Sequence, residues 1–108
     1  MTATPARKAH RRREQARQRA EAYRAVDLRD RGACRVCGAV SRKVHHHHVR
    51  YRSLGGRDTP ENLVLVCPRC HDDIHAARIR VTGDAEVRDA FGLLAGLTIV
   101  RRPPEGWS

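Results

Sequence analysis

The sequence is poor in aromatic residues and has no long apolar run. Its 108 residues include one Phe, one Trp and two Tyr, which is 4% of the chain. With so few large apolar side chains to bury, the core gains little free energy to offset the conformational entropy lost on folding. We therefore expect a further stabilising interaction, such as a bound metal or a disulfide. The longest uncharged apolar run, residues 91–100, is too short to cross a bilayer, and the N-terminus lacks the apolar stretch of a secretory signal. We expect one small cytoplasmic domain without a membrane partner.

Lysine and acidic residues are also scarce. All but two of the 22 basic residues are arginine, only 12 residues are acidic, and the formal net charge is +10. Residues 1–31 hold ten of the basic residues and are rich in helix formers, so we predict a helix from Ala6 to Arg31 with Gly32 as its C-cap. Arginine suits phosphate contacts, which favours an arm that follows a nucleic-acid backbone over a solvated charged helix. The apolar stripe of this helix is weak and consists of Ala16, Ala20, Tyr23 and Val26.

The rest of the chain divides into short elements. We predict a helical turn after Thr59, with Thr59 as N-cap, and a helix from His71 to Ala77 with Asp72 and Asp73 in its first turn. Extended or β segments are predicted at residues 44–52, 63–66, 78–81 and 97–100. This alternation predicts a small α+β fold.

All four cysteines lie in two C-x-x-C turns, formed by Cys34 with Cys37 and by Cys67 with Cys70. Two such turns complete the tetrahedral thiolate shell that zinc prefers, and in a reducing compartment zinc is favoured over disulfides. We therefore predict a structural Zn²⁺ whose binding supplies the stabilisation that the small core lacks. A shell filled by four thiolates is closed, so any chemistry must use other residues.

Histidine is the remaining candidate for that chemistry. Six of the seven histidines lie between residues 45 and 75. His71 and His75 are four residues apart on the predicted helix, so they share a face and can hold one metal ion. His45 to His48 form an extended run whose alternate members point to opposite sides, so at most two of them can join that pair.

These residues resemble the HNH endonuclease family, in the zinc-containing subgroup whose C-x-x-C turns bracket the ββα-metal motif. The resemblance covers roughly residues 23–80. It rests on His47-His48-Val49, Ser53-Leu54-Gly55-Gly56, the run from Pro60-Glu61-Asn62 to Cys70-His71, and His75. It implies a ββα-metal fold held by the four-cysteine zinc and preceded by the basic helix. We expect three parts: a basic arm (1–31), a nuclease core (32–80) and a C-terminal extension packed on the core (81–108).

The resemblance also implies roles for single residues. His48 matches the general base that takes a proton from the attacking water, and Asn62 matches the asparagine that holds the loop and the base in position. His47, His71 and His75 match the ligands of a catalytic divalent metal, which is Mg²⁺, Mn²⁺, Ni²⁺ or Zn²⁺. A register shifted by one residue would give these roles to His46 and His47; we prefer the later pair because an apolar residue, Val49, follows it. His45 and His46 receive no role from the resemblance: they could support the metal ligands, face the phosphate or be solvated, and solvation is the default expectation. Tyr51 stands where members often have proline, and we expect this difference to have little effect on chemistry.

The function implied is metal-dependent hydrolysis of DNA phosphodiester bonds, with little sequence preference, leaving a 5′-phosphate and a 3′-hydroxyl. The DNA contacts are expected from the arm and from the segment after the histidines: Arg11, Arg12, Arg13, Arg17, Arg50 and Arg52. The setting would be the cytoplasm of a bacterium or a phage-infected cell. Three alternatives stay open: a homodimer, a non-catalytic zinc-stabilised nucleic-acid-binding module, and an accessory component that works with a packaging or restriction partner.

Overall fold

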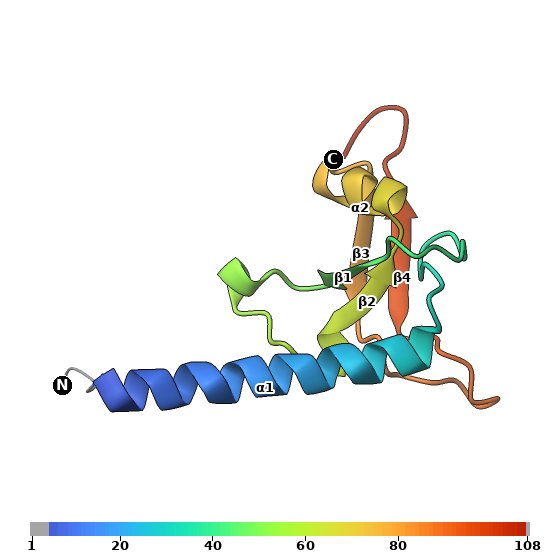
Figure 1. Cartoon of the computed structure of the whole chain (residues 1–108). Coiled ribbons are helices and arrows are strands. Elements are labelled where there is room, and N and C mark those ends of the chain that lie inside the picture. Colours follow the sequence, from blue (N-terminus) through green and yellow to red (C-terminus); the bar gives the residue numbers. More distant parts are fainter. Residues whose placement is uncertain (1–4, 108) are drawn as a thin grey trace.

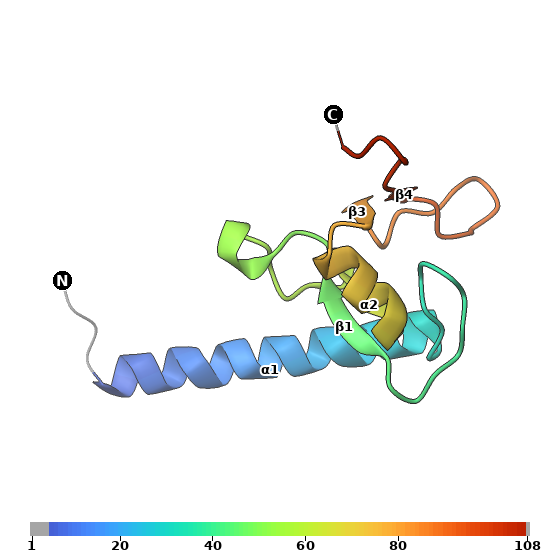
Figure 2. The same cartoon turned by 90° about the horizontal axis from the view of Figure 1, so that it is seen from above.

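A long helix and two small sheets make up this computed structural model, which describes residues 5–107. The elements are α1 (Pro5–Asp30), β1 (His45–His48), 3-10 turns at Arg52–Leu54 and Pro60–Asn62, β2 (Leu63–Val66), α2 (Pro68–His75), β3 (Ile79–Gly83) and β4 (Leu97–Arg101). The molecule measures 52 × 34 × 29 Å, and the N-terminal part of α1 projects beyond everything else (Figures 1 and 2). The small α+β fold is confirmed.

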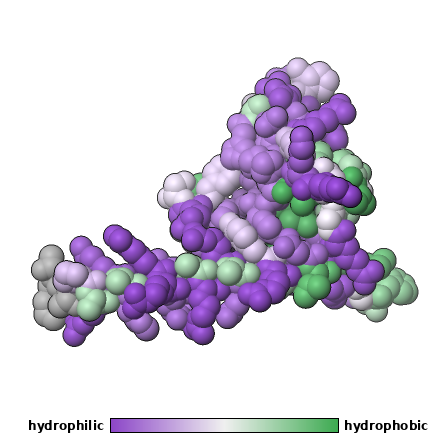
Figure 3. Space-filling model, in the orientation of Figure 1, coloured by the Kyte–Doolittle hydropathy of each residue, from purple (hydrophilic) through white to green (hydrophobic). Residues whose placement is uncertain are grey.

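Helix α1 packs only through its C-terminal third. Ala22, Val26 and Asp30 are its buried residues, and their spacing of four places them on one face. Of the predicted stripe, Val26 is buried and Tyr23 half-buried, but Ala16 and Ala20 are exposed, so the N-terminal half of the stripe was wrong. The face of α1 visible in Figure 3 is mostly hydrophilic. The helix ends where Arg31 and then Gly32 adopt left-handed backbone, with φ of 52° and 73°.

The centre of the fold is the β1–β2 hairpin followed by α2. The strands pair antiparallel, with His45 opposite Val66 and His48 opposite Leu63. Every residue of β2 is buried because the strand is covered on both faces. Leu63 and Leu65 pack on Ala22 and Val26 of α1. Val64 and Val66 pack on the other side, in a cluster that includes residues of α2 and β3. This is the ββα arrangement that the resemblance implies.

Helix α2 begins three residues earlier than the sequence suggested. Cys67 is its N-cap, with the Sγ accepting a hydrogen bond from the backbone N–H of Cys70, and Pro68 takes the first helical position. The second C-x-x-C turn is therefore the first turn of the helix. Asp72 and Asp73 lie beyond that turn, so their predicted interaction with the helix N-terminus is wrong. Thr59 does precede a helical turn, but its side chain makes no capping hydrogen bond.

A second hairpin, β3–β4, lies against the first. Ile79 and Val81 of β3 point into the core, whereas β4 is almost wholly exposed. The predicted strands at residues 78–81 and 97–100 are confirmed with a shift of one or two residues. The turn after β3 is tied to the centre of the fold by the backbone N–H of Ala85, which donates to the carbonyl of Glu61.

An ion-pair network joins the end of α1 to β2. Asp30 has a fully buried side chain, and its two oxygens accept from Nε and Nη2 of Arg29 at 2.7 and 3.0 Å. The same carboxylate accepts from Arg35 and from the backbone N–H of Leu65, both at 3.1 Å. Burial alone would raise the pKa of Asp30, but these donors and the charges of Arg29 and Arg35 hold it below its usual value. Arg29 also donates to the carbonyls of Pro60 and Leu63 at 2.7 and 2.6 Å, on either side of Asn62.

Candidate functional site

The four cysteines converge on one point. Their sulfur atoms all lie within 4.8 Å of one another, with Cys34, Cys67 and Cys70 buried and Cys37 exposed. The Sγ atoms of Cys37 and Cys67 are 3.8 Å apart. Ligands at about 2.3 Å from a tetrahedral zinc are separated by about 3.8 Å, so this spacing suits a zinc shell and is far too long for a disulfide. The cluster fits a structural zinc site, as the sequence predicts.

The thiols differ in how readily they ionise in the metal-free chain. Burial raises the pKa of Cys34, but hydrogen bonds from the backbone N–H groups of Cys37, Cys67 and Val36 outweigh it and bring that pKa down to about 7. Burial and the neighbouring thiols raise the pKa of Cys70 well above its usual value. Four thiolates this close repel one another unless a cation lies among them, which is the electrostatic reason for a metal here.

A second cluster gathers three histidines from two elements. His47 of β1 and His71 and His75 of α2 each offer a ring nitrogen, and these atoms lie within 4.8 Å of one another. The Nε2 atoms of His71 and His75 are 3.0 Å apart. The four-residue spacing on α2 brings the latter pair together, and the antiparallel hairpin sets His47 against it, with ring centroids 5.6 and 5.7 Å away. His46 is not part of this cluster.

Burial keeps two of the three rings, His47 and His71, in the form that binds metals. Desolvation, and then the neighbouring histidines, lower the pKa of His47 to about 4. Burial, followed by His75 and His45, also lowers the pKa of His71. Imidazole must be neutral to coordinate a cation, so at neutral pH both rings are ready ligands. A donor set of three imidazoles suits a divalent transition metal.

The run of histidines in β1 divides between two sides of the strand. His45 stacks on His71 with centroids 4.6 Å apart, so it joins His47 on the side of α2. On the other side, His46 stacks on Tyr23 of α1 at 4.0 Å, and its Nε2 lies 2.7 Å from Oδ1 of Asp27. The alternation is as expected. His45 is exposed to solvent although it stacks on His71, whereas His46 is half-buried and has partners on α1, so the default expectation of a solvated side chain does not describe His46.

His48 has a carboxylate partner that the sequence did not reveal. Its Nε2 is 2.7 Å from Oδ1 of Asp58, and the side chains are only 15% and 17% exposed. An ionised carboxylate can only accept, so Nε2 is the donor in this contact, and in the neutral imidazole this tautomer leaves the lone pair on Nδ1. An acid ten residues after a histidine has no periodicity that would mark the pair, since the loop between them is irregular.

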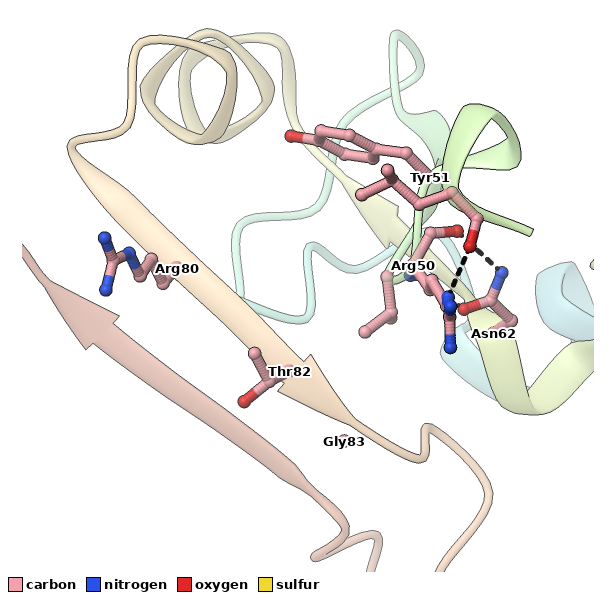
Figure 4. Close-up of a pocket in the computed structure, with 8 residues that line it drawn as sticks. Arg50, Tyr51, Asn62, Arg80, Thr82 and Gly83 are labelled. Carbon is pink, nitrogen blue, oxygen red and sulfur yellow. Dashed lines mark hydrogen bonds between the residues drawn. The ribbon is translucent and has the colours of Figure 1, made fainter. Parts of the chain in front are cut away.

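Asn62 fixes that loop. Its Oδ1 accepts from the backbone N–H of Arg50 at 2.8 Å, and its Nδ2 donates to the carbonyl of Arg50 at 3.0 Å; Figure 4 shows the two residues side by side. The Nδ2 also donates to the carbonyl of Arg57 at 2.9 Å. Val49 is held by the same residue, since its N–H donates to the carbonyl of Asn62. The amide thus closes the segment between His48 and Asp58 at both ends.

Tyr51 is a second residue that the sequence undervalued. Its ring stacks on His75 with centroids 5.9 Å apart and meets His47 edge to face at 5.8 Å. Two of the three clustered histidines therefore touch one half-exposed tyrosine. One signal for Tyr51 is present in the sequence, a tyrosine at a position where members of the family often have proline. The contacts of Tyr51 could not be predicted, because they depend on how the loop folds back.

The arginines expected to contact DNA lie on two parts of the chain, the projecting part of α1 and the segment after β1. Arg11, Arg12, Arg13 and Arg17 are exposed on the projecting part of α1. Arg52 lines a hollow between α1 and the loop, together with Gln15, Gln18 and Asp58. Arg50 is exposed beside Tyr51. The hollow lined by Arg52 thus reaches the carboxylate that contacts His48.

Comparisons with known proteins agree with this geometry. Residues 34–77, which include both clusters, match the family model of HNH endonucleases. Anaredoxin of Nostoc sp. strain PCC 7120 is 33% identical over 48 residues, which is 44% of this chain and 63% of that protein. The type IV methyl-directed restriction enzyme EcoKMcrA of Escherichia coli strain K12 is 47% identical over 32 residues, 30% of this chain and 12% of the enzyme. The matched segments thus span less than two thirds of either relative.

Residues 34–77 form an HNH endonuclease domain, and the four-cysteine cluster within it fits a structural zinc site. Its ββα arrangement places the histidine cluster between β1 and α2. Within residues 5–107, no helix combines the length and apolarity needed to cross a membrane.

Proposed function

We propose that this chain is a metal-dependent DNA endonuclease that uses His48 as its general base. The observation that carries the proposal is the convergence of His47, His71 and His75 on one point, directly beside His48 in the strand and inside an HNH domain. The products would be a 5′-phosphate and a 3′-hydroxyl. We expect little sequence preference, since no helix within residues 5–107 resembles a dedicated base-reading helix.

Three side chains would divide the work at the scissile bond. His48 takes a proton from the attacking water on the ring nitrogen that Asp58 leaves free. Asp58 holds the imidazole in one tautomer and orientation, and stabilises it once it is protonated. Asn62 holds the loop that carries both partners, so it positions the base without touching the substrate.

His47, His71 and His75 are the proposed ligands of the catalytic metal, which is Mg²⁺, Mn²⁺, Ni²⁺ or Zn²⁺. Imidazole ligands favour the transition metals, and the exposure of His75 leaves the cluster open on one side for a phosphate. A divalent cation bound there supplies Lewis-acid stabilisation of the charge that develops on the phosphate and on the leaving 3′ oxygen.

DNA is the proposed partner, and α1 supplies much of its electrostatic attraction. Arg11, Arg12, Arg13 and Arg17 point into solvent on a helix that extends away from the domain, where they can follow a phosphate backbone (Figure 1). Arg52 and Arg50 continue the positive charge toward the histidines. We retain the division into an arm (1–31), a core (32–80) and an extension (81–108) as a proposal, with the end of the arm built into the core.

The experiment is nicking of supercoiled plasmid by the purified protein, with Mg²⁺, Mn²⁺, Ni²⁺ or Zn²⁺ added in turn. We expect metal-dependent nicking by the wild type and at least a hundredfold loss in His48→Ala, the lower range for removal of a general base being about 10²-fold. The ends of the nicked strand are then tested for ligation, which requires a 5′-phosphate beside a 3′-hydroxyl.

His46→Ala is the matched control. His46 also lies in β1 and also has a carboxylate 2.7 Å away, in Asp27, but it faces α1 rather than the proposed reaction site. It should keep its activity while folded. Loss of nicking in His46→Ala but not in His48→Ala would support the shifted register. If the wild type binds DNA but cuts with none of the metals, the proposal fails and a binding or partner-dependent role replaces it.

A further inference from the structure

Two adjoining hollows lie next to the histidine cluster. The larger, about 630 Å³, lies between residues 49–54 and β3 (Figure 4). The smaller, about 240 Å³, is lined by His47 and Ile74 among others. Both are lined by Tyr51, whose ring touches His47 and His75. A ligand in the larger hollow would therefore lie one side chain away from the proposed metal ligands.

The walls of the larger hollow combine apolar surface with positive charge. Val49, Leu54 and the ring of Tyr51 supply apolar contact, and Arg50 and Arg80 supply the charge. Within the described residues 5–107, neither hollow has an acidic residue in its lining. The guanidinium of Arg80 stacks on the ring of Trp107, 3.8 Å from its centre, and Trp107 lines neither hollow, so Arg50 is the arginine whose charge is nearest the opposite wall. Such walls fit a ligand with a flat apolar face attached to an anion.

The free edge of β3 adds hydrogen-bonding groups. On the side of β4, the backbone N–H of Arg102 donates to the carbonyl of Arg78, and the N–H of Asp84 donates to the carbonyl of Gly96. With the antiparallel register, the backbone N–H and C=O groups of the even-numbered residues of β3 therefore point toward β4. The backbone N–H and C=O groups of Val81 and Gly83 therefore point to the opposite edge. Gly83 lines the larger hollow and has no side chain, so its backbone forms part of the wall. Backbone donors and acceptors suit the edge of a nucleobase.

We propose that the larger hollow binds an unstacked nucleobase of the DNA strand whose phosphate reaches the histidine cluster. This rests on the proposed function and names the substrate class. A base within a duplex hides both its faces and its pairing edge, so only a single-stranded, mispaired or extruded base can enter. The net charge of +10 and the two arginines favour a polyanion over a protein segment as the occupant. Locally unpaired DNA is thus bound better than uniform duplex.

The test is photo-crosslinking to an oligonucleotide that carries one iodouracil, either single-stranded or annealed to its complement. No divalent metal is added, so the readout does not depend on cleavage. We expect crosslinks to Tyr51 or to residues 80–83, from the single strand much more than from the duplex. Crosslinks confined to α1, or equal yields from both forms, would overturn the inference.

Affinity for the single strand is measured in parallel with matched variants. Leu54 and Leu93 are similarly exposed, 62% and 65%, and only Leu54 lines the hollow. Leu54→Glu and Leu93→Glu change the net charge equally, so a larger loss in Leu54→Glu reports the hollow itself. Tyr51→Ala should weaken binding by about 5- to 150-fold, the range for one base–aromatic stack. Equal losses in the two leucine variants would refute the site.

The inference and the proposed function fail separately. Plasmid nicking without a crosslink in the hollow would leave a nuclease that has no base site. A crosslink in the hollow without nicking would leave a base-binding site in a protein that does not cut. Circular dichroism of each variant shows that a lost crosslink does not reflect unfolding.

Discussion

Asp30→Ala should be the most damaging single change in α1, although the residue touches no proposed catalytic group. It removes a fully buried carboxylate that accepts from Arg29, Arg35 and the backbone of Leu65. Breaking a buried ion pair from one side costs about 3–5 kcal/mol, because the partner charge stays buried without compensation. The side chain of Arg29 is only 5% exposed, but it keeps two carbonyl acceptors and Glu86. We therefore expect a loss of about 3 kcal/mol, the lower end of that range.

Urea unfolding followed by the helical circular dichroism signal measures this loss, with zinc present and no chelator. Asp73→Ala is the control, because Asp73 also pairs with an arginine, at 2.8 Å from Arg78, but the arginine is 54% exposed. That surface pair should contribute below about 1 kcal/mol. If the two variants lose the same free energy of unfolding, the Asp30 network does not join α1 to β2 as argued.

Four further outcomes are expected. Cys67→Ser should lose bound zinc and much of its helical signal, because the binding free energy of a structural zinc, about 10–16 kcal/mol, is also folding free energy; a normal melting curve would count against the zinc site. Without a metal on the histidines, stability should fall by about 2 kcal/mol from pH 7 to pH 5, because the unfolded chain takes up a proton near 6.5 that His47 accepts only at about 4; His47→Gln should lose this slope in urea titrations. Asp58→Asn should lower kcat by about 10- to 100-fold with DNA affinity retained, through loss of the orienting partner of His48; an unchanged kcat would release Asp58 from that role. Deletion of residues 1–20 should flatten the salt dependence of DNA binding, and an unaltered slope would make the arm a solvated helix.

The spacing of chemically distinctive residues carried most of what the sequence could predict. Two C-x-x-C turns define a zinc shell wherever the intervening chain runs, and a four-residue spacing on a helix brings His71 and His75 together. The four-cysteine cluster and two of the three clustered histidines are therefore visible before any fold is known, whereas His47 was assigned only through the resemblance to the HNH family. The partner of His48 is not, because Asp58 reaches it through a loop whose path depends on three hydrogen bonds of Asn62.

The errors about α1 have a different cause. Helical periodicity marks a buried face by its apolar residues, but here one of the three buried positions is a charged one, Asp30. Ala16 and Ala20 fit the period equally well and are exposed, because the domain is too small to reach the N-terminal half of the helix. Which turns of a long helix are covered depends on the tertiary structure, and the local sequence does not contain that information.

The two clusters are mechanically coupled through α2. Cys67 caps this helix, Cys70 completes its first turn, and the next residue, His71, already belongs to the histidine cluster. A helix of eight residues is unstable in isolation, so its position depends on what holds its ends. The zinc shell holds the N-terminal end, and it thereby also sets the direction in which His71 and His75 meet His47. A zinc bound by the four cysteines would thus position two of the three proposed ligands of the catalytic metal, although it has no chemistry of its own.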